Sequence, residues 1–284
     1  MKKFLRTVWQ AGYPILIEVS VNLLITGIAV LIFASMFYKS TGLMGVNIAA
    51  ELLESNIMLL TGVVSFVLIP LFMYFIRSDA KKHGEDSDAP VEIKTVLMCV
   101  LAACGAALAG AFMMSMLGLS GSNDNFAQYV EIFDDTAPVA VVLVTIIMTP
   151  LFEELLFRGL VFKRICRAYG AVAAALVSAL IYAVTFGNLS QGIFGFIMGL
   201  VYAYAYTKTD KIWVPVVMHM AASTFVILLN ALVENTNMAI AGSEAIAGVI
   251  GVIAGAAAAV SSVMYLQKFG KDVLVKETET EKDV

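Results

Sequence analysis

The chain has 284 residues, of which 60% are hydrophobic and 14% are charged, and its mean hydropathy is +0.89. Soluble globular proteins carry about 25% charged residues, so this composition excludes that class. We therefore expect an integral membrane protein surrounded by the lipid bilayer, with no nucleic-acid partner. The net charge of -4 adds little, because the positions of lysine and arginine decide how a membrane protein is oriented.

Eight apolar runs approach or exceed the roughly 20 residues that a helix needs to cross the hydrocarbon core. They cover residues 13–37, 56–76, 95–117, 138–157, 171–187, 192–207, 212–232 and 245–266. This pattern predicts an all-α polytopic protein of about eight transmembrane helices, with a single transmembrane domain over residues 1–266. Residues 267–284 are rich in Lys, Glu and Thr and are expected to form a charged cytoplasmic tail.

Lysine and arginine are distributed unevenly between the loops. If the N-terminus is cytoplasmic, Lys39 is the one basic residue that falls on the outer side, and the predicted outer loops 118–137 and 233–244 contain none. Cytoplasmic loops carry such an excess in multi-pass proteins. We expect both termini in the cytoplasm and the protein in the cell membrane, which for this chain would be a bacterial plasma membrane.

The segment Phe152–Arg158 places three ionisable side chains near the cytoplasmic end of an apolar helix. Each costs roughly 2.5–3.5 kcal/mol at the bilayer centre, so pairing or a polar cavity is expected. Glu154 and Arg158 are four residues apart, in the order that favours an ion pair. Glu153 is rotated by about 100° from Glu154 and lacks that partner. Glu153 is therefore a candidate functional residue, although both glutamates could instead brace neighbouring helices.

One of the two histidines lies within the membrane. His83 falls in a cytoplasmic loop, whereas His219 follows the start of the seventh predicted helix at a depth comparable to that of Glu153. Ser223 comes four residues after His219 and shares its helix face. The pattern predicts a carboxylate, an imidazole and a hydroxyl in one site.

Two features predict a cavity beside these residues. Pro150 removes a backbone hydrogen bond just before the acids and should kink the helix. Tyr182 and Phe186 share a face of the fifth predicted helix, and residues 187–192, which include Asn188, interrupt the apolar sequence. Interruptions at membrane depth are tolerated where they face protein or a water-filled cavity.

A carboxylate and an imidazole in a hydrated cavity favour hydrolysis. Glu153 would act as general base, and His219 would polarise a carbonyl group or stabilise an oxyanion. The sequence assigns no metal or cofactor site, because catalytic zinc normally has three protein ligands and no HExxH motif occurs.

Three motifs on eight predicted helices resemble the CAAX-processing and bacteriocin-processing family (CPBP, or Abi) of intramembrane endopeptidases. They are Glu153-Glu154-x3-Arg158, the aromatic-x3 element ending at Phe186, and His219-x3-Ser223. The resemblance covers about residues 138–235. It implies cleavage of a peptide or membrane-protein substrate by a glutamate-activated water in a cytoplasm-facing cavity, and zinc is possible by older descriptions of the family.

The resemblance also implies a role for each matched residue. Glu153 would be the base and Glu154 with Arg158 the structural pair. His219 and the residue at 223 would contact the oxyanion.

Two of the three motifs depart from the family pattern. The second motif is usually Phe-x3-His, whereas this chain has Tyr182 and Phe186, and the third usually ends in Asn or Asp where this chain has Ser223. Phenylalanine cannot handle a proton. Catalysis would then depend on Glu153 with a substitute such as Thr185 or Asn188, or would be lost, and we expect an impaired site.

Two other functions stay open from sequence. The chain could be a non-catalytic peptide-binding or bacteriocin-immunity-type protein, which Phe186 favours. It could also be a small transporter or channel that uses Glu153 as an ion or proton site. The lack of internal repeats and of further buried charges argues against transport.

Overall fold

The computed structural model describes residues 2–41, 52, 56–84, 90–116, 142–235 and 243–269, and every element within these ranges is helical. The eight predicted helices are all found there: α1 (Lys2–Thr41), α3 (Ile57–His83), α4 (Ile93–Met116), a continuous helix over 142–169, α9 (Ala171–Thr185), α10 (Leu189–Thr209), α11 (Trp213–Asn235) and α12 (Ser243–Phe269). The start of the predicted tail, 267–269, belongs to α12. Residues 270–284 and most of the two predicted outer loops lie outside the described residues.

Five of the described helices are long and apolar enough to cross a membrane. The candidate spans are Lys2–Met36, Ile57–His83, Ile93–Met114, Leu189–Thr209 and Val249–Lys268, and Ala171–Thr185 and Trp213–Leu229 are shorter apolar helices. Their number indicates a multi-pass membrane protein. Residues 155–162 of the central 142–169 helix are all buried, whereas Ala171–Thr185 exposes Val172, Leu180 and Val184.

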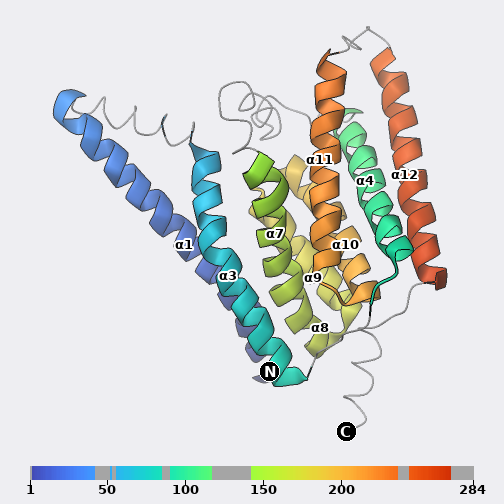
Figure 1. Ribbon diagram of the computed structural model, residues 1–284, viewed down its shortest axis with the longest axis horizontal. Helices are drawn as coiled ribbons and strands as arrows, with labels where there is room; N and C mark the ends of the chain where they lie inside the picture. The colour runs from blue at the N-terminus through green and yellow to red at the C-terminus, as the bar shows by residue number, and fades with distance from the viewer. Residues whose placement is uncertain are drawn as a thin grey trace.

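The helices form three groups (Figure 1). The pair α1 and α3 leans away on one side, and α4 packs along α12 on the other. Between them lie the 142–169 helix, α9, α10 and α11, which carry the motif residues.

Glycine allows α4 and α12 to approach closely. A Cβ at Gly105 would lie 2.7 Å from the carbonyl oxygen of Gly255, and a Cβ at Gly255 would lie 2.6 Å from that of Gly105. The GxxxG spacing of residues 251–255 therefore serves packing within one chain.

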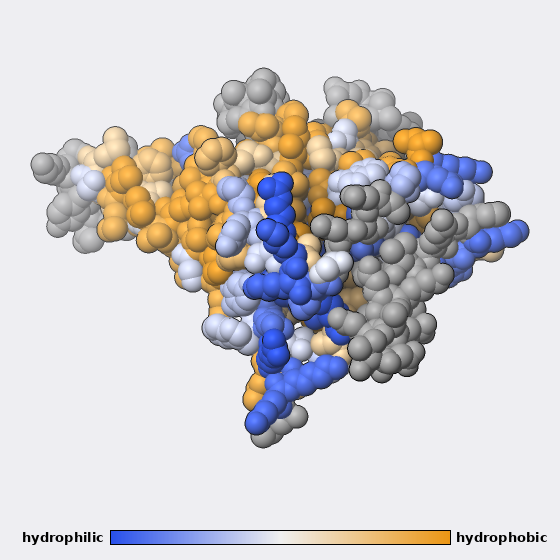
Figure 2. All heavy atoms as spheres, turned by 60° about the horizontal axis from the view of Figure 1, so that its bottom comes forward, coloured by the Kyte–Doolittle hydropathy of each residue, from blue (hydrophilic) through white to orange (hydrophobic). Residues whose placement is uncertain are grey.

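The basic helix ends lie together at one end of the bundle. Figure 2 brings this hydrophilic end forward, with apolar helix surface behind it. Its exposed basic residues include Lys2, Arg6, Lys81, Lys82 and Lys94. This clustering agrees with the charge pattern of the sequence, and the assignment of that end to the cytoplasm stays a prediction.

Arg164 holds three helices together near this basic end. Its Nε donates to Asp79 of α3 at 2.6 Å, and its Nη1 and Nη2 donate to the Gln10 carbonyl and the Tyr13 hydroxyl of α1 at 2.5 and 2.7 Å. The guanidinium also lies over the Tyr13 ring. These contacts anchor α1 and α3 to the central helix.

The central helix extends further than the sequence predicts. It consists of η1 (Val142–Met148), α7 (Thr149–Glu154), η2 (Leu155–Phe162) and α8 (Lys163–Tyr169), with π-helical geometry in η1 and η2. The acids therefore lie near its middle and not at its end, because residues 155–162 are all buried and continue the helix through the core. The expected irregularity at Pro150 coincides with the change from π- to α-helix at Thr149. Short π segments often occur at functional sites.

Candidate active site

Glu154 and Arg158 form the predicted ion pair in a fully enclosed position. Arg158 Nη1 lies 3.0 Å from Glu154 Oε1, and both side chains are 0% exposed. Arg158 Nη2 donates to the Gly199 carbonyl at 2.9 Å, and the guanidinium lies 5.0 and 5.2 Å from the ring centroids of Tyr182 and Tyr202. The charge of Arg158 is thus balanced by a carboxylate, a carbonyl and two aromatic faces.

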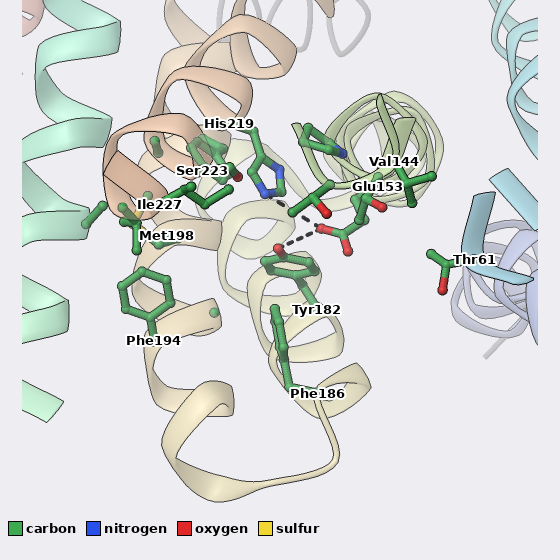
Figure 3. Close-up of a pocket in the computed structure, with 18 of the residues that line it drawn as sticks. Thr61, Val144, Glu153, Tyr182, Phe186, Phe194, Met198, His219, Ser223 and Ile227 are labelled. Carbon is green, nitrogen blue, oxygen red and sulfur yellow. Dashed lines mark hydrogen bonds and ion pairs between the residues drawn. The ribbon is translucent and has the colours of Figure 1, made fainter. Parts of the chain in front are cut away.

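Glu153 points away from this ion pair. Its side chain is 20% exposed and lines a cavity. The Tyr182 hydroxyl of α9 donates to Glu153 Oε2 at 2.8 Å, and His219 Nε2 of α11 lies 3.9 Å from the same oxygen. Figure 3 shows Tyr182 and His219 reaching the Glu153 carboxylate from different helices. Glu153 therefore has a polar partner that the sequence does not predict.

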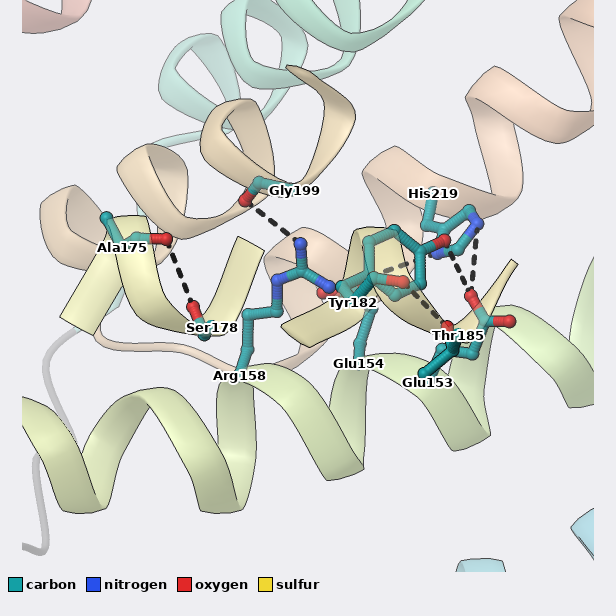
Figure 4. A network of polar contacts seen from close by, with 9 residues as sticks. All are labelled: Glu153, Glu154, Arg158, Ala175, Ser178, Tyr182, Thr185, Gly199 and His219. Atoms are coloured by element: carbon teal, nitrogen blue, oxygen red, sulfur yellow. Dashed lines mark hydrogen bonds and ion pairs between the residues drawn. The ribbon is translucent and has the colours of Figure 1, made fainter. Parts of the chain in front are cut away.

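His219 connects the two glutamates. Its Nδ1 lies 3.0 Å from Glu154 Oε1, the oxygen that also accepts from Arg158 (Figure 4). An ionised carboxylate can only accept, so Nδ1 carries the proton and Nε2 faces Glu153. The imidazole stacks on Tyr202 with centroids 4.9 Å apart and planes inclined by 25°. These contacts fix the ring orientation and leave Nε2 for a ligand in the cavity.

The cavity beside Glu153 has a volume of about 280 Å³. Its polar lining includes the side chains of Glu153, Tyr182, His219 and Ser223. Its apolar lining includes Phe186, Phe194, Met198, Val226 and Ile227. A site of this kind suits an apolar ligand with a few polar groups that fix its position.

The cavity extends away from the basic end of the bundle. On α3 it contacts residues 57–61 at the N-terminal end, whereas Lys81 and Lys82 lie at the C-terminal end. On α11 it contacts residues 219–227, beyond the start of the helix at Trp213. The side toward the basic end is filled by buried Leu160, Phe162 and Tyr206. With the orientation predicted from the charges, the cavity would extend toward the non-cytoplasmic side, and the cytoplasm-facing cavity expected from sequence stays a prediction.

The supporting residues proposed from sequence do not all reach the site. Phe186 and Ser223 line the cavity. Asn188 does not, because it caps α10: its side chain is exposed and accepts from the Gln191 amide at 2.8 Å. Thr185 is also outside the lining, and its hydroxyl donates to the Tyr182 carbonyl at 2.6 Å. Neither suggested substitute for a second histidine is in place.

The described residues do not form a catalytic zinc site. Among them, no group of three His, Cys, Asp or Glu side chains is arranged to hold a metal ion. Glu154 Oε1 and His219 Nδ1 are occupied by each other, which leaves Glu153 and His219 Nε2 facing the cavity. Two donors are fewer than the three that catalytic zinc normally has.

Sequence reasoning missed two residues on α10. Gly199 supplies the carbonyl for Arg158, and a Cβ there would lie 3.3 Å from Arg158 Nη2. Tyr202 lies against both Arg158 and His219. The spacing of Gly199 and Tyr202 places them on one helix face, but only the packing of α10 against the central helix identifies their partners.

The segment that contains this site matches a known protein family. The family described as "Type II CAAX prenyl endopeptidase Rce1-like" matches residues 135–225, which include Glu153, Glu154, Arg158, His219 and Ser223. Two curated relatives are similar to the chain. Residues 135–225 are therefore similar to the Rce1-like family of CAAX-type membrane peptidases.

The relatives are both bacterial. The chain is 23% identical over 175 residues to "Putative membrane peptidase YdiL" of Bacillus subtilis (strain 168), covering 60% of this chain and 71% of that protein. It is 31% identical over 101 residues to "Membrane-embedded CAAX protease MroQ" of Staphylococcus aureus (strain USA300), covering 34% of this chain and 40% of that protein. No solved structure matches the chain.

Proposed function

We propose that this chain is an intramembrane endopeptidase that hydrolyses a peptide bond with a water molecule activated by Glu153. The observation that carries the proposal is the position of Glu153. Its carboxylate faces the cavity beside His219 Nε2, whereas the adjacent Glu154 is enclosed with Arg158. The similarity of residues 135–225 to the Rce1-like family supports the same reaction class, and the substrate would be a peptide or membrane protein.

Glu153, His219 and Ser223 each have a separate role in the proposed reaction. Glu153 removes a proton from water as the oxygen attacks the carbonyl carbon. The carbon–nitrogen bond then breaks, and the proton passes from Glu153 to the leaving amine. A protonated His219 donates from Nε2 to the developing oxyanion, and Glu154 stabilises the imidazolium at Nδ1. Ser223 lines the same cavity and offers a second hydroxyl donor.

The Glu154–Arg158 pair acts as support for this chemistry. It holds His219 by Nδ1 and joins the central helix to α10 through the Gly199 carbonyl. Such contacts keep the reacting groups in position without touching the substrate.

A non-catalytic peptide-binding function is the second candidate. It is favoured by Phe186, an aromatic ring in the cavity at the position where the family usually has histidine. A binding protein would retain the apolar cavity and would not depend on Glu153 for any product.

The test is a cleavage screen with purified protein in lipid. Membrane-embedded peptides and prenylated peptides are incubated with the parent chain and with Glu153→Gln, and products are identified by mass spectrometry. The endopeptidase predicts at least one product that Glu153→Gln fails to release. Binding of a peptide with equal affinity by both proteins, and no product from either, would favour the second candidate.

A further inference from the structure

The second motif of the family usually ends in histidine, whereas this chain has Phe186. Four residues earlier, Tyr182 carries a hydroxyl that reaches the same site. Tyr182 is 3% exposed, lines the cavity and donates through its hydroxyl to Glu153 Oε2 at 2.8 Å. Phe186 lies on the same helix face, with its ring 5.0 Å from that of Tyr182. The two departures within the second motif, a tyrosine at 182 and a phenylalanine at 186, thus occur in one contacting pair.

We propose that the Tyr182 hydroxyl positions the catalytic carboxylate of Glu153 and so replaces the polar group absent at position 186. This inference rests on the proposed peptidase function. It revises the expectation of an impaired site, because the carboxylate keeps a polar partner supplied by another residue. Thr185 and Asn188 do not fulfil this role, since neither lines the cavity.

The packing around Tyr182 explains how one hydroxyl can hold Glu153. The Tyr182 ring lies 4.9 Å from that of Phe157 and 5.0 Å from the Arg158 guanidinium. Phe186 covers another edge of the ring in a T-shaped contact. With the ring held by these neighbours, the hydroxyl direction is fixed and the hydrogen bond costs little further side-chain entropy.

Because Oε2 of Glu153 is hydrogen-bonded, Oε1 of the same carboxylate stays available to water. The Tyr182 hydroxyl and His219 Nε2 both approach Oε2 of Glu153. Oε1 is then the oxygen that can accept a proton from a water molecule in the cavity. Without the hydroxyl, the carboxylate can turn about its last side-chain bond, whose rotation is broad.

Gly195 on α10 leaves room for the Phe186 ring. A Cβ at Gly195 would overlap the Phe186 ring, so an aromatic side chain at 186 is accommodated by the absence of a side chain on α10. The smaller imidazole of Phe186→His fits the same space. Exchanging the two residues is therefore a practical experiment.

The first experiment compares three proteins on a peptide that the parent cleaves. Tyr182→Phe keeps the ring and removes only the hydroxyl, and we expect kcat to fall about 10- to 100-fold with KM nearly unchanged, because a hydrogen bond to a charged group is lost. The double variant Tyr182→Phe with Phe186→His should recover most of the loss. Equal rates for Tyr182→Phe and the parent would overturn the inference, as would a double variant that stays as slow as Tyr182→Phe.

A second readout does not need a substrate. The infrared carboxylate bands of Glu153 are assigned from the difference between the parent and Glu153→Gln. They should shift in Tyr182→Phe, because the carboxylate loses its donor. Unshifted bands would overturn the inference even if no peptide were cleaved. Shifted bands together with no cleavage by any variant would support the contact and count against the peptidase function alone.

Discussion

Glu153 and Glu154 are adjacent in the chain, yet their carboxylates lie in different environments. Glu154 is 0% exposed and binds Arg158 and His219 through one oxygen, whereas Glu153 is 20% exposed, accepts from Tyr182 and lines the cavity. The first environment is suited to holding the fold together and the second to contacting a ligand. Substitutions at the Glu154 ion pair should therefore mainly lower stability, whereas substitutions at Glu153 should mainly lower activity.

Arg158→Leu should destabilise the fold more than Glu153→Gln does. Removing one partner of this fully buried pair leaves the Glu154 carboxylate with the His219 Nδ1 contact alone, and breaking a buried pair costs about 3–5 kcal/mol. The Gly199 carbonyl also loses its donor. Folded yield and melting temperature in detergent measure the effect.

Arg77→Leu is the matched control for this prediction, because Arg77 is an exposed arginine near the basic end of α3. It should melt within a few degrees of the parent. If Arg158→Leu melted like this control, the buried pair would not support the fold.

Gly105→Ala should destabilise the packing of α4 against α12. The added Cβ would lie 2.7 Å from the Gly255 carbonyl oxygen and 2.9 Å from the Ala259 nitrogen, and backbone atoms cannot move aside as a side chain can. Overpacking of this kind typically costs about 1–3 kcal/mol. Thermal unfolding of the purified variant measures it.

Gly12→Ala serves as the comparison, since no atom lies within 4 Å of a Cβ at Gly12. Alanine favours a helix more than glycine does, so this variant should be as stable as the parent or more so. Equal melting temperatures for the two glycine variants would be inconsistent with the close approach of the helices.

Reporter fusions should give a cytoplasmic signal after Gly84, Lys211 and the C-terminus, and an external signal after Asn125. The reason is the concentration of lysine and arginine in the loops on one side. Paired phosphatase and fluorescent-protein fusions in living cells measure the side directly. An external C-terminus would mean that the number of spans is odd.

Thiol labelling should reach the cavity from the side opposite the basic end. Ser223→Cys and Thr145→Cys line the cavity, and Lys82→Cys lies at the exposed basic end. In a background with Cys99, Cys104 and Cys166 replaced by alanine, a membrane-impermeant reagent should modify the cavity positions and Lys82→Cys from opposite faces of sealed vesicles. Modification of all three from one face would refute this direction of access.

The sequence predicts the presence of the helices well and the length of the central helix less well. Apolar run length locates all eight helices, and the i,i+4 spacing of Glu154 and Arg158 gives the ion pair. The central helix is predicted too short, because charges at Arg158 and beyond resemble a helix end when their burial is unknown. Arg158 is in fact enclosed by Tyr182 and Tyr202.

Sequence patterns alone do not predict the contact between the Tyr182 hydroxyl and Glu153. Tyrosine at an apolar helix position resembles a packing residue, and its contact with Glu153 depends on how α9 crosses the central helix. The direction in which the cavity extends within the bundle is likewise not given by sequence patterns. It depends on which side of Glu153 the core fills, and Phe162 and Tyr206 fill the side near the basic end.

The cleavage rate of Glu153→Gln relative to the parent protein tests the central claim most directly. Glutamine keeps the size of the side chain and can still accept from Tyr182, but it cannot take a proton from water. On a peptide that the parent cleaves, and with equal melting temperatures for both proteins, kcat should fall by about 10²–10⁴-fold. A variant that cleaves the peptide at the rate of the parent would show that Glu153 does not activate the attacking water.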